Sequence, residues 1–312
     1  MVDKKNLFCL ISAYYTFTKL RSLLSNFQTQ NSQNNPCDLT LTHASPVSLV
    51  FVGSGPLEKS LQLYALSLGL NVFSSSSSVH ASLDDPESSE NHLSSSDCQS
   101  DTLQPLHLSR LTFPNQNNDY LTFSDSATFT PASGSVYFLG FRQIDQNPIF
   151  YSLAEMFVLP SKSEEWGLVV NEAMASSLPV VVSKAAGCAE DLLPLTSSLP
   201  STISNLSNSA SMVDTLYDTI SVRLSAQFHS LNLPNLFSAS SSLVQCSNGF
   251  TFDPDSSDDL ALAILCLAES AELRSCMGGL SLDIINNFSC SNFARQVQSI
   301  VDAFSGDSGP LP

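Results

Sequence analysis

The sequence predicts an α/β protein whose strands form a parallel sheet. Strands and helices alternate along the apolar segments once the serine-rich stretches are set aside. The strand segments, such as "FVLP" at 157–160 and "VVVS" at 180–183, are short and apolar throughout, as in strands buried on both faces. The apolar segments amount to about 180 residues, a normal size for one domain. We therefore expect a single Rossmann-like domain within residues 1–312, with helices flanking the sheet.

The N-terminal segment, residues 1–28, has the pattern of an amphipathic helix. Its apolar residues recur at helical spacing, at Leu7, Leu10, Ile11, Tyr14 and Phe17. Lysines followed by an apolar stretch also open secretory signal peptides, but no small-x-small cleavage site follows cleanly. The helix is the better interpretation.

The next segment, residues 47–70, predicts a strand, a turn and a helix. A short valine-rich run leads into a turn at Gly53 and Gly55, and Pro56 suits the first helical position. Gly69 supplies the stop. One face of this helix would carry Leu57, Leu61, Tyr64 and Leu68.

Two serine-rich stretches interrupt the alternation. Residues 74–135 lack periodicity over most of their length and predict a mostly disordered insertion. Residues 195–243 form a second serine-rich insertion. Both can leave a sheet intact if they exit as surface loops.

The remaining elements follow the same alternating order. Ser257 or Asp258 is a natural N-cap for the helix that begins there. We expect strands at 136–140, 156–160 and 180–183, and a short strand with a turn at 249–254. Helices are expected at 147–153, 168–176 and 189–193, and three C-terminal helices run to about residue 304.

Charge and cysteine usage narrow the class of protein. The net charge of −17 argues against nucleic acid or an anionic membrane as the main partner. No apolar run approaches the ~20 residues that span a bilayer. The eight cysteines form no C-x-x-C pair, so neither a zinc site nor a disulfide framework is expected. These features indicate a cytoplasmic protein, either free or peripheral at a membrane.

The segment "SKSEEWGLVVNEAMAS" at 161–176 has the features of an anion site. Its loop follows a strand, and ligands bind at the carboxyl ends of strands in open parallel sheets. The helix that follows Gly167 has unpaired amides and a positive dipole end. Gly167, after Trp166, lets the backbone come close to a ligand. Glu164 and Glu172 would flank whatever binds there.

Carboxylates on either side of an anion site suggest the outline of a nucleotide sugar. Phosphates would meet the helix amides, while carboxylates accept hydrogen bonds from the hydroxyl groups of sugar rings. The chemistry would need no metal, because Lys, Arg and helix amides can stabilise the charge of the leaving diphosphate. We therefore expect no cofactor beyond the donor substrate.

These residues resemble the C-terminal nucleotide-sugar-binding domain of family 4 glycosyltransferases, which are retaining enzymes of the two-domain GT-B architecture. Glu164 and Glu172 have the Glu-x7-Glu spacing of that family, and Glu165 is one residue off. Five further stretches match in the same order. They are "KKNLFCLISAY", "LVFVGSGPLEKSLQLYALSLGL", "VYFLGFRQIDQNPIFYSLAEMFVLPS", "AAGCAEDLL" and "NGFTFDPDSSDDLALAILCLAESAELRSCMGG".

The resemblance implies roles for individual residues. Glu172 would hold the ribose hydroxyls, Glu164 would contact the donor sugar, and Lys5 would neutralise the diphosphate. The other implied substrate contacts are the amides of Gly167, Leu168 and Val169, the turn glycines Gly53 and Gly55, the side chains Glu165 and Trp166, and Phe141 and Arg142 beside the base. Each also has a structural interpretation: surface charge for the glutamates and the lysine, a tight turn for the glycines, and a packed wall for Trp166.

The chain also departs from the family pattern. The family's first strand, its phosphate arginine and its N-terminal acceptor domain have no match, and the five histidines all lie outside the matching stretches. Two hypotheses follow. The chain is the donor-binding half of a transferase that moves a sugar from a UDP- or GDP-type donor to an acceptor hydroxyl, within a longer protein or with a separate acceptor-domain chain. Alternatively, it is an inactive or truncated nucleotide-sugar-binding or interaction module that needs a partner acceptor domain.

Overall fold

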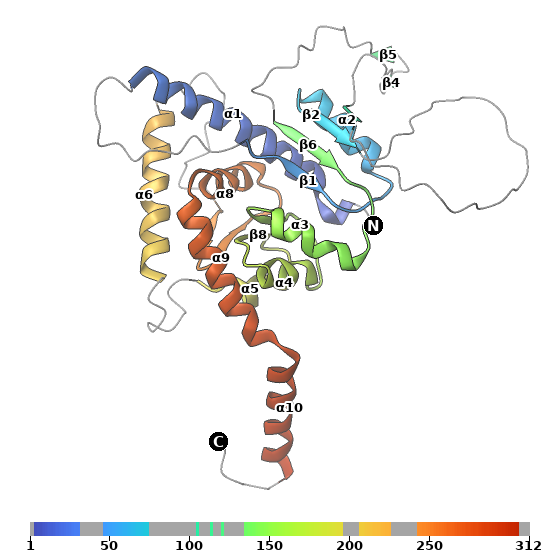
Figure 1. Ribbon diagram of the computed structural model, residues 1–312, viewed down its shortest axis with the longest axis vertical. Helices are drawn as coiled ribbons and strands as arrows, with labels where there is room; N and C mark the ends of the chain where they lie inside the picture. Colours follow the sequence, from blue (N-terminus) through green and yellow to red (C-terminus); the bar gives the residue numbers. More distant parts are fainter. Residues whose placement is uncertain are drawn as a thin grey trace, which may run out of the picture. The chain divides into compact units, whose positions relative to one another are not determined.

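The computed structural model describes residues 3–31, 46–74, 104–105, 113–114, 120–121, 134–195, 206–225 and 242–305 (Figure 1). The chain divides into two compact units. The first unit comprises residues 1–45 and 145–312, and the second unit comprises residues 46–144. Each unit contains a mainly parallel sheet, so the α/β class and the parallel strands are confirmed.

The sheet of the second unit has the strand order β1-β6-β2-β3. The first three strands are parallel, and β3 pairs with β2 in the antiparallel direction. A separate antiparallel pair, β4 and β5, contains two residues in each strand. The strands are β1 (Leu49–Phe51), β2 (Asn71–Ser74), β3 (Gln104–Pro105), β4 (Phe113–Pro114), β5 (Tyr120–Leu121) and β6 (Ser135–Phe138).

Aromatic pairs hold the three parallel strands of the second unit together. Phe51 stacks on its neighbour Phe138 with ring centroids 4.9 Å apart, and Phe73 stacks on Tyr137 at 4.8 Å. The pairs lie on opposite faces because successive side chains along a strand alternate. Cross-strand contacts of this kind fix the register.

Helix α2 (Glu58–Ser67) follows β1, as expected. Pro56 lies in the turn before it, so its predicted place at the first helical position is wrong. Its buried face differs from the predicted one. Leu61, Ala65 and Leu66 are buried, whereas Leu57, Tyr64 and Leu68 are half-buried. The helix ends where predicted, because Gly69 adopts a φ of 81° and Leu70 N–H donates to Ala65 O.

Most of the two expected insertions lies outside the described residues. Within 74–135, the described part consists of β3, β4 and β5 and the two ends of the segment. Within 195–243, residues 206–225 form helix α6 (Leu206–Ser225), which the sequence analysis did not predict. Val213 and Ile220 of α6 are buried, so this part of the insertion packs on the first unit.

The sheet of the first unit has the strand order β7-β8-β10-β9. Strands β7 (Phe157–Leu159), β8 (Val180–Ser183) and β10 (Gly249–Phe252) are parallel, and β9 (Val244–Cys246) is antiparallel to β10. Every residue of β8 and β10 is buried, as their continuous apolar runs predict. The edge strand β9 was not predicted.

The helices of the first unit agree with the predicted order. The expected N-terminal helix begins after a 3-10 turn. The N-cap of α8 is Ser256 and not Ser257 or Asp258, because Ser256 Oγ accepts a hydrogen bond from Asp259 N–H. The elements are η1 (Asp3–Lys5), α1 (Leu7–Asn31), α3 (Asn147–Leu153), α4 (Leu168–Ala175), α5 (Ala189–Leu192), α8 (Ser257–Glu269), α9 (Ala271–Ile285), η5 (Asn286–Phe288) and α10 (Cys290–Ser305), with η3 (Ile144–Gln146) at the boundary of the two units.

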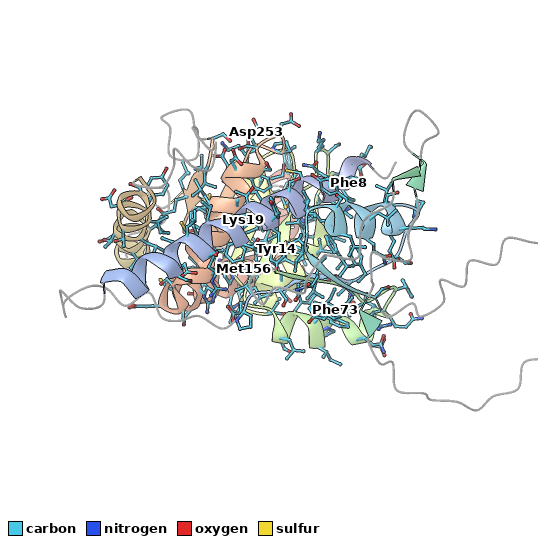
Figure 2. The ribbon with its side chains drawn as sticks, turned by 90° about the horizontal axis from the view of Figure 1, so that it is seen from above. Phe8, Tyr14, Lys19, Phe73, Met156 and Asp253 are labelled. Carbon is cyan, nitrogen blue, oxygen red and sulfur yellow. The ribbon has the colours of Figure 1, made fainter. Side chains whose placement is uncertain are left out.

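Helix α1 packs along α8, and Figure 2 shows it lengthwise with Phe8, Tyr14 and Lys19 labelled. Tyr14 and Phe17 are fully buried, which confirms the amphipathic pattern read from the sequence. An ion pair joins the two helices, with 2.9 Å between Arg21 Nε and Glu269 Oε1. In the described residues, no helix has both the length and the apolarity needed to cross a membrane.

Candidate functional site

The candidate site lies at the carboxyl ends of β7 and β8. The loop after β7, residues 160–167, is hydrogen-bonded to the loop after β8, residues 184–188. Gly187 N–H donates to Glu164 O at 2.9 Å, and Cys188 N–H donates to Trp166 O at 3.2 Å. Glu164 and Ala186 form a parallel β-bridge. The backbone that carries Glu164 is therefore held in place by the neighbouring loop.

The two loops approach so closely that only glycine fits at one point. A Cβ atom added at Gly187 would lie 2.0 Å from the carbonyl oxygen of Glu165. Real side chains do not tolerate such a distance, so any larger residue would displace the backbone next to Glu164. Nothing in the local sequence pattern distinguishes Gly187.

Gly167 forms the junction between this loop and α4. Its φ of 98° and ψ of 59° lie in the left-handed region, where glycine is unstrained. An added Cβ would lie 2.9 Å from Leu159 Cδ2 and 3.4 Å from Glu164 Cγ. Glycine is thus required by the backbone turn and by packing within the protein, in addition to the close ligand approach that the sequence suggested.

The start of α4 presents amides that the described residues leave unpaired. The first intrahelical bond runs from Val170 N–H to Gly167 O at 2.8 Å. In the described part of the chain, the amides of Gly167, Leu168 and Val169 make no hydrogen bond. Leu168 and Val169 are exposed. These amides have the geometry of a helix N-terminus that can receive an anion.

Glu164 is paired with Lys5, as the sequence analysis placed both in one site. Lys5 Nζ lies 2.5 Å from Glu164 Oε2, and Ser161 Oγ donates to the same oxygen at 3.4 Å. The Lys5 side chain is 53% exposed and the Glu164 side chain 20%. The lysine can therefore reach solvent and a ligand, while the carboxylate is partly shielded.

Asn6 positions Lys5. It adopts a φ of 55°, and its Nδ2 donates to Pro160 O at 3.1 Å and to Pro254 O at 2.7 Å. These carbonyls follow β7 and β10, so Asn6 ties η1 to the carboxyl ends of two strands. Lys162 N–H donates to Lys4 O at 2.7 Å and adds a further tie. Nothing in the local sequence pattern distinguished Asn6.

Glu172 has a different partner. It lies in the second turn of α4, and the Tyr151 hydroxyl donates to Glu172 Oε2 at 2.8 Å. Burial and this hydrogen bond raise the pKa of Tyr151, so its hydroxyl remains a donor at neutral pH. Tyr151 was also missed by the sequence analysis, because its partner lies on another helix.

Trp166 and Glu165 complete the loop. Trp166 Nε1 donates to Asn171 Oδ1 at 3.0 Å, and the indole ring packs against the core cluster around Leu159 and Val170. Packing therefore accounts for the tryptophan. The Glu165 side chain is exposed and makes no hydrogen bond within the described residues.

Cys188 lies beneath Gly167, with its Sγ 3.5 Å from the position of an added Cβ. Burial, together with the charge of Glu164, raises the pKa of the Cys188 thiol to about 11. The thiol is therefore protonated at neutral pH and serves as a packing residue. Among the described residues, no group of three or more His, Cys, Asp or Glu side chains could hold a metal ion.

The remaining predicted site residues belong to the second unit. Gly53 has a φ of 126°, and its N–H donates to Gly140 O at 2.8 Å, while Gly55 O accepts from Glu58 N–H. Phe141 is 65% exposed, and Arg142 Nη1 donates to Phe141 O at 3.3 Å. The glycines thus shape the turn before α2. The ligand roles of these four residues stay predictions.

One family model matches the part of the chain that carries the candidate site. Residues 116–193 match the model for glycosyl transferases group 1. This segment is similar to group 1 glycosyltransferases, and the match covers less than half of the chain. It contains β6, α3, β7, α4 and β8, and with them Glu164, Glu172, Gly167 and Tyr151. Lys5, Gly53 and Gly55 lie outside the glycosyltransferase match.

A curated relative is similar to this chain over a short stretch. A sulfoquinovosyl transferase of Arabidopsis thaliana is 47% identical over 57 residues, which is 18% of this chain. The aligned stretch covers 11% of the relative's own length. No solved structure matches the chain to a significant degree.

Proposed function

We propose that this chain binds the donor of a glycosyl transfer reaction. The donor is a nucleotide sugar of the UDP or GDP type, and the sugar passes to an acceptor hydroxyl with retention of configuration at the anomeric carbon. The acceptor-binding part is supplied by a longer form of the protein or by a separate chain. The proposal places the donor at the carboxyl ends of β7 and β8.

One arrangement carries this proposal. Along the chain, the unpaired amides of residues 167–169 lie between Glu164 on the loop and Glu172 in the second turn of α4. A diphosphate at the amides would have a carboxylate on each side. Glu172 would accept from ribose hydroxyls, and Glu164 from hydroxyls of the donor sugar.

In this proposal Lys5 acts on the leaving group. Its ammonium is half exposed beside Glu164 and can turn toward a diphosphate. As the bond between the anomeric carbon and the phosphate oxygen breaks, negative charge grows on that oxygen. Lys5 and the helix amides would stabilise this charge, and the phosphate would accept the proton of the acceptor hydroxyl. No metal is needed for these steps.

The relative suggests one donor sugar to test. Its name states that it transfers a sulfoquinovosyl group. We therefore include a nucleotide sulfoquinovose beside nucleotide glucose among the donors to be tested.

Titration calorimetry tests the proposal directly. The full chain is titrated with UDP, GDP and ADP, and Glu172→Ala serves as the matched variant. We expect one nucleotide to bind and the variant to bind it at least about 10-fold more weakly, since a hydrogen bond to a charged group contributes roughly 1.5–3 kcal/mol. Equal heats for the wild type and the variant would remove the ribose role of Glu172.

The alternative function is an inactive binding module. It predicts donor binding without turnover. The two functions are therefore separated by mixing the longer protein, or the chain together with its acceptor-domain partner, with donor and a candidate acceptor. Sugar transfer that Glu164→Gln abolishes supports the enzyme.

A further inference from the structure

Tyr151 contacts Glu172, whose carboxylate would bind the ribose hydroxyls in the proposed function. Its hydroxyl donates to Glu172 Oε2 at 2.8 Å. Tyr151 belongs to α3 and Glu172 to α4, so this hydrogen bond joins two helices of the first unit. Both side chains are half-buried, which leaves the pair open to solvent on one side.

The ring of Tyr151 is fixed by its surroundings. It meets Phe157, at the start of β7, edge to face, with ring centroids 6.0 Å apart and an interplanar angle of 61°. Both rings pack against the core cluster that includes Leu159 and Met174. The hydroxyl therefore occupies a defined position, as a positioning group requires.

The hydrogen bond uses only part of the capacity of Glu172. A carboxylate offers about four acceptor positions on its two oxygens. Tyr151 occupies one of them on Oε2. Among the described residues no other side chain is hydrogen-bonded to the Glu172 carboxylate, since Ser176 Oγ donates to the main-chain oxygen of Glu172. Oε1 keeps its full capacity for a ligand hydroxyl.

We propose that Tyr151 is a positioning residue for Glu172, holding Oε2 so that Oε1 is presented to the ribose hydroxyls. This inference rests on the proposed function of Glu172. A free glutamate loses roughly 1–2 kcal/mol of rotamer entropy when a ligand immobilises it. Tyr151 removes part of that cost by ordering the side chain before the nucleotide arrives.

A purely structural bond between α3 and α4 makes a different prediction. Loss of a structural bond would disturb the site as a whole and weaken every ligand to a similar degree. Loss of a positioning bond would weaken the ligands that carry ribose hydroxyls and leave the others unchanged. The ratio of the affinities for a ribonucleotide and for its dideoxy counterpart therefore separates the two roles.

The test measures that ratio by calorimetry on the full chain. The probes are UDP and 2′,3′-dideoxy-UDP, or the corresponding GDP pair if GDP binds more tightly. We expect the wild type to prefer UDP by about 10- to 100-fold, as for hydrogen bonds to a charged group. Tyr151→Phe should lower this preference about fivefold and leave the dideoxy affinity within about twofold. Tyr15→Phe, which removes a hydroxyl on α1, should change neither.

A double variant checks that the effect passes through Glu172. Glu172→Ala should abolish the preference, and adding Tyr151→Phe should then have no further effect. Phe157→Leu keeps the hydroxyl but removes the ring contact, so it should lower the preference to a smaller extent. It remains a test even if Tyr151→Phe fails to fold.

The outcomes distinguish the two proposals. If Glu172→Ala abolishes the preference while Tyr151→Phe and Phe157→Leu leave it unchanged, the positioning role is wrong and the ribose role stands. An equal loss of UDP and dideoxy-UDP binding in Tyr151→Phe also overturns the positioning role. If the wild type shows no preference, the ribose role of Glu172 fails, and the positioning role fails with it.

Discussion

Lys5 Nζ lies 2.5 Å from Glu164 Oε2, which joins two residues that are 159 positions apart in the chain. The pair connects η1 to the loop after β7. Because the lysine is half exposed, the ion pair by itself adds little to stability. Its value is positional, since it places a cation beside Glu164, on the loop that leads into α4.

Glu164→Gln should separate sugar binding from nucleotide binding. The neutral amide loses the charge that would accept hydrogen bonds from sugar hydroxyls, so we expect affinity for UDP-glucose to fall about 10- to 100-fold. Affinity for UDP should stay within about threefold or rise, because Lys5 is then free to meet phosphate. Calorimetry with both ligands measures this difference.

Glu190→Gln, on α5, is the matched control for that variant. Its side chain is exposed and makes no hydrogen bond within the described residues, so both affinities should stay unchanged. If Glu164→Gln lowers the affinities for UDP and for UDP-glucose equally, Glu164 acts on the loop and not on the sugar.

Replacement of Asn6 should loosen the N-terminal segment. Asn6→Ala loses two hydrogen bonds of about 1 kcal/mol each and forces alanine into the left-handed region. We expect the free energy of unfolding to fall by about 3 kcal/mol, measured by urea denaturation. Asn6→Gly loses the same hydrogen bonds but keeps a relaxed backbone, so it should lower the free energy of unfolding by a smaller amount. The reverse order would contradict the role assigned to the backbone conformation.

Gly187→Ala should displace the loop that carries Glu164. Its Cβ would collide with the Glu165 carbonyl, so we expect a loss of about 1–3 kcal/mol of stability together with weaker nucleotide binding. Gly279→Ala in α9 is the control, because its Cβ would meet nothing within 4 Å. The free energy of unfolding of this helical control should rise by about 0.5–1 kcal/mol. If Gly187→Ala binds the nucleotide as tightly as the wild type does, the loop tolerates the displacement.

The sequence predicted most elements and the core of the site because both depend on local pattern. The apolar runs of β8 and β10, the loop between Pro160 and Gly167, and the Glu164–Glu172 spacing are all visible within short windows. The distribution of the strands over two sheets is not visible there. Strands of both sheets are short and apolar, and pairing partners are chosen by tertiary contacts.

The residues that sequence reasoning missed act over long distances in the chain. Asn6 donates to carbonyls 154 and 248 residues away, and Tyr151 reaches the next helix. An asparagine and a tyrosine at these positions carry no distinctive signal by themselves. Similarly, α6 lies within a serine-rich stretch, and its helix is defined by the burial of Val213 and Ile220.

Arg21→Met should destabilise the first unit in a way that depends on pH. Arg21 pairs with Glu269, whose side chain is 6% exposed, so the variant leaves a buried carboxylate without this partner. Breaking a buried ion pair costs about 3–5 kcal/mol. Lys19→Met, which removes an exposed cation from the same helix, should change the unfolding free energy by less than about 0.5 kcal/mol.

The pH dependence follows from the direction of the shift at Glu269. Burial raises the pKa of Glu269 above its ordinary value, and Arg21 counteracts part of that rise. Without Arg21 the folded-state pKa rises further, so the folded chain holds a proton that the unfolded chain releases. Stability is then lost as pH increases from the unfolded pKa, about 4.3, through the raised folded pKa. The difference in melting temperature between Arg21→Met and the wild type should therefore be larger at pH 7.5 than at pH 5. If the difference is the same at both pH values, the loss of stability does not come from the ionisation of Glu269.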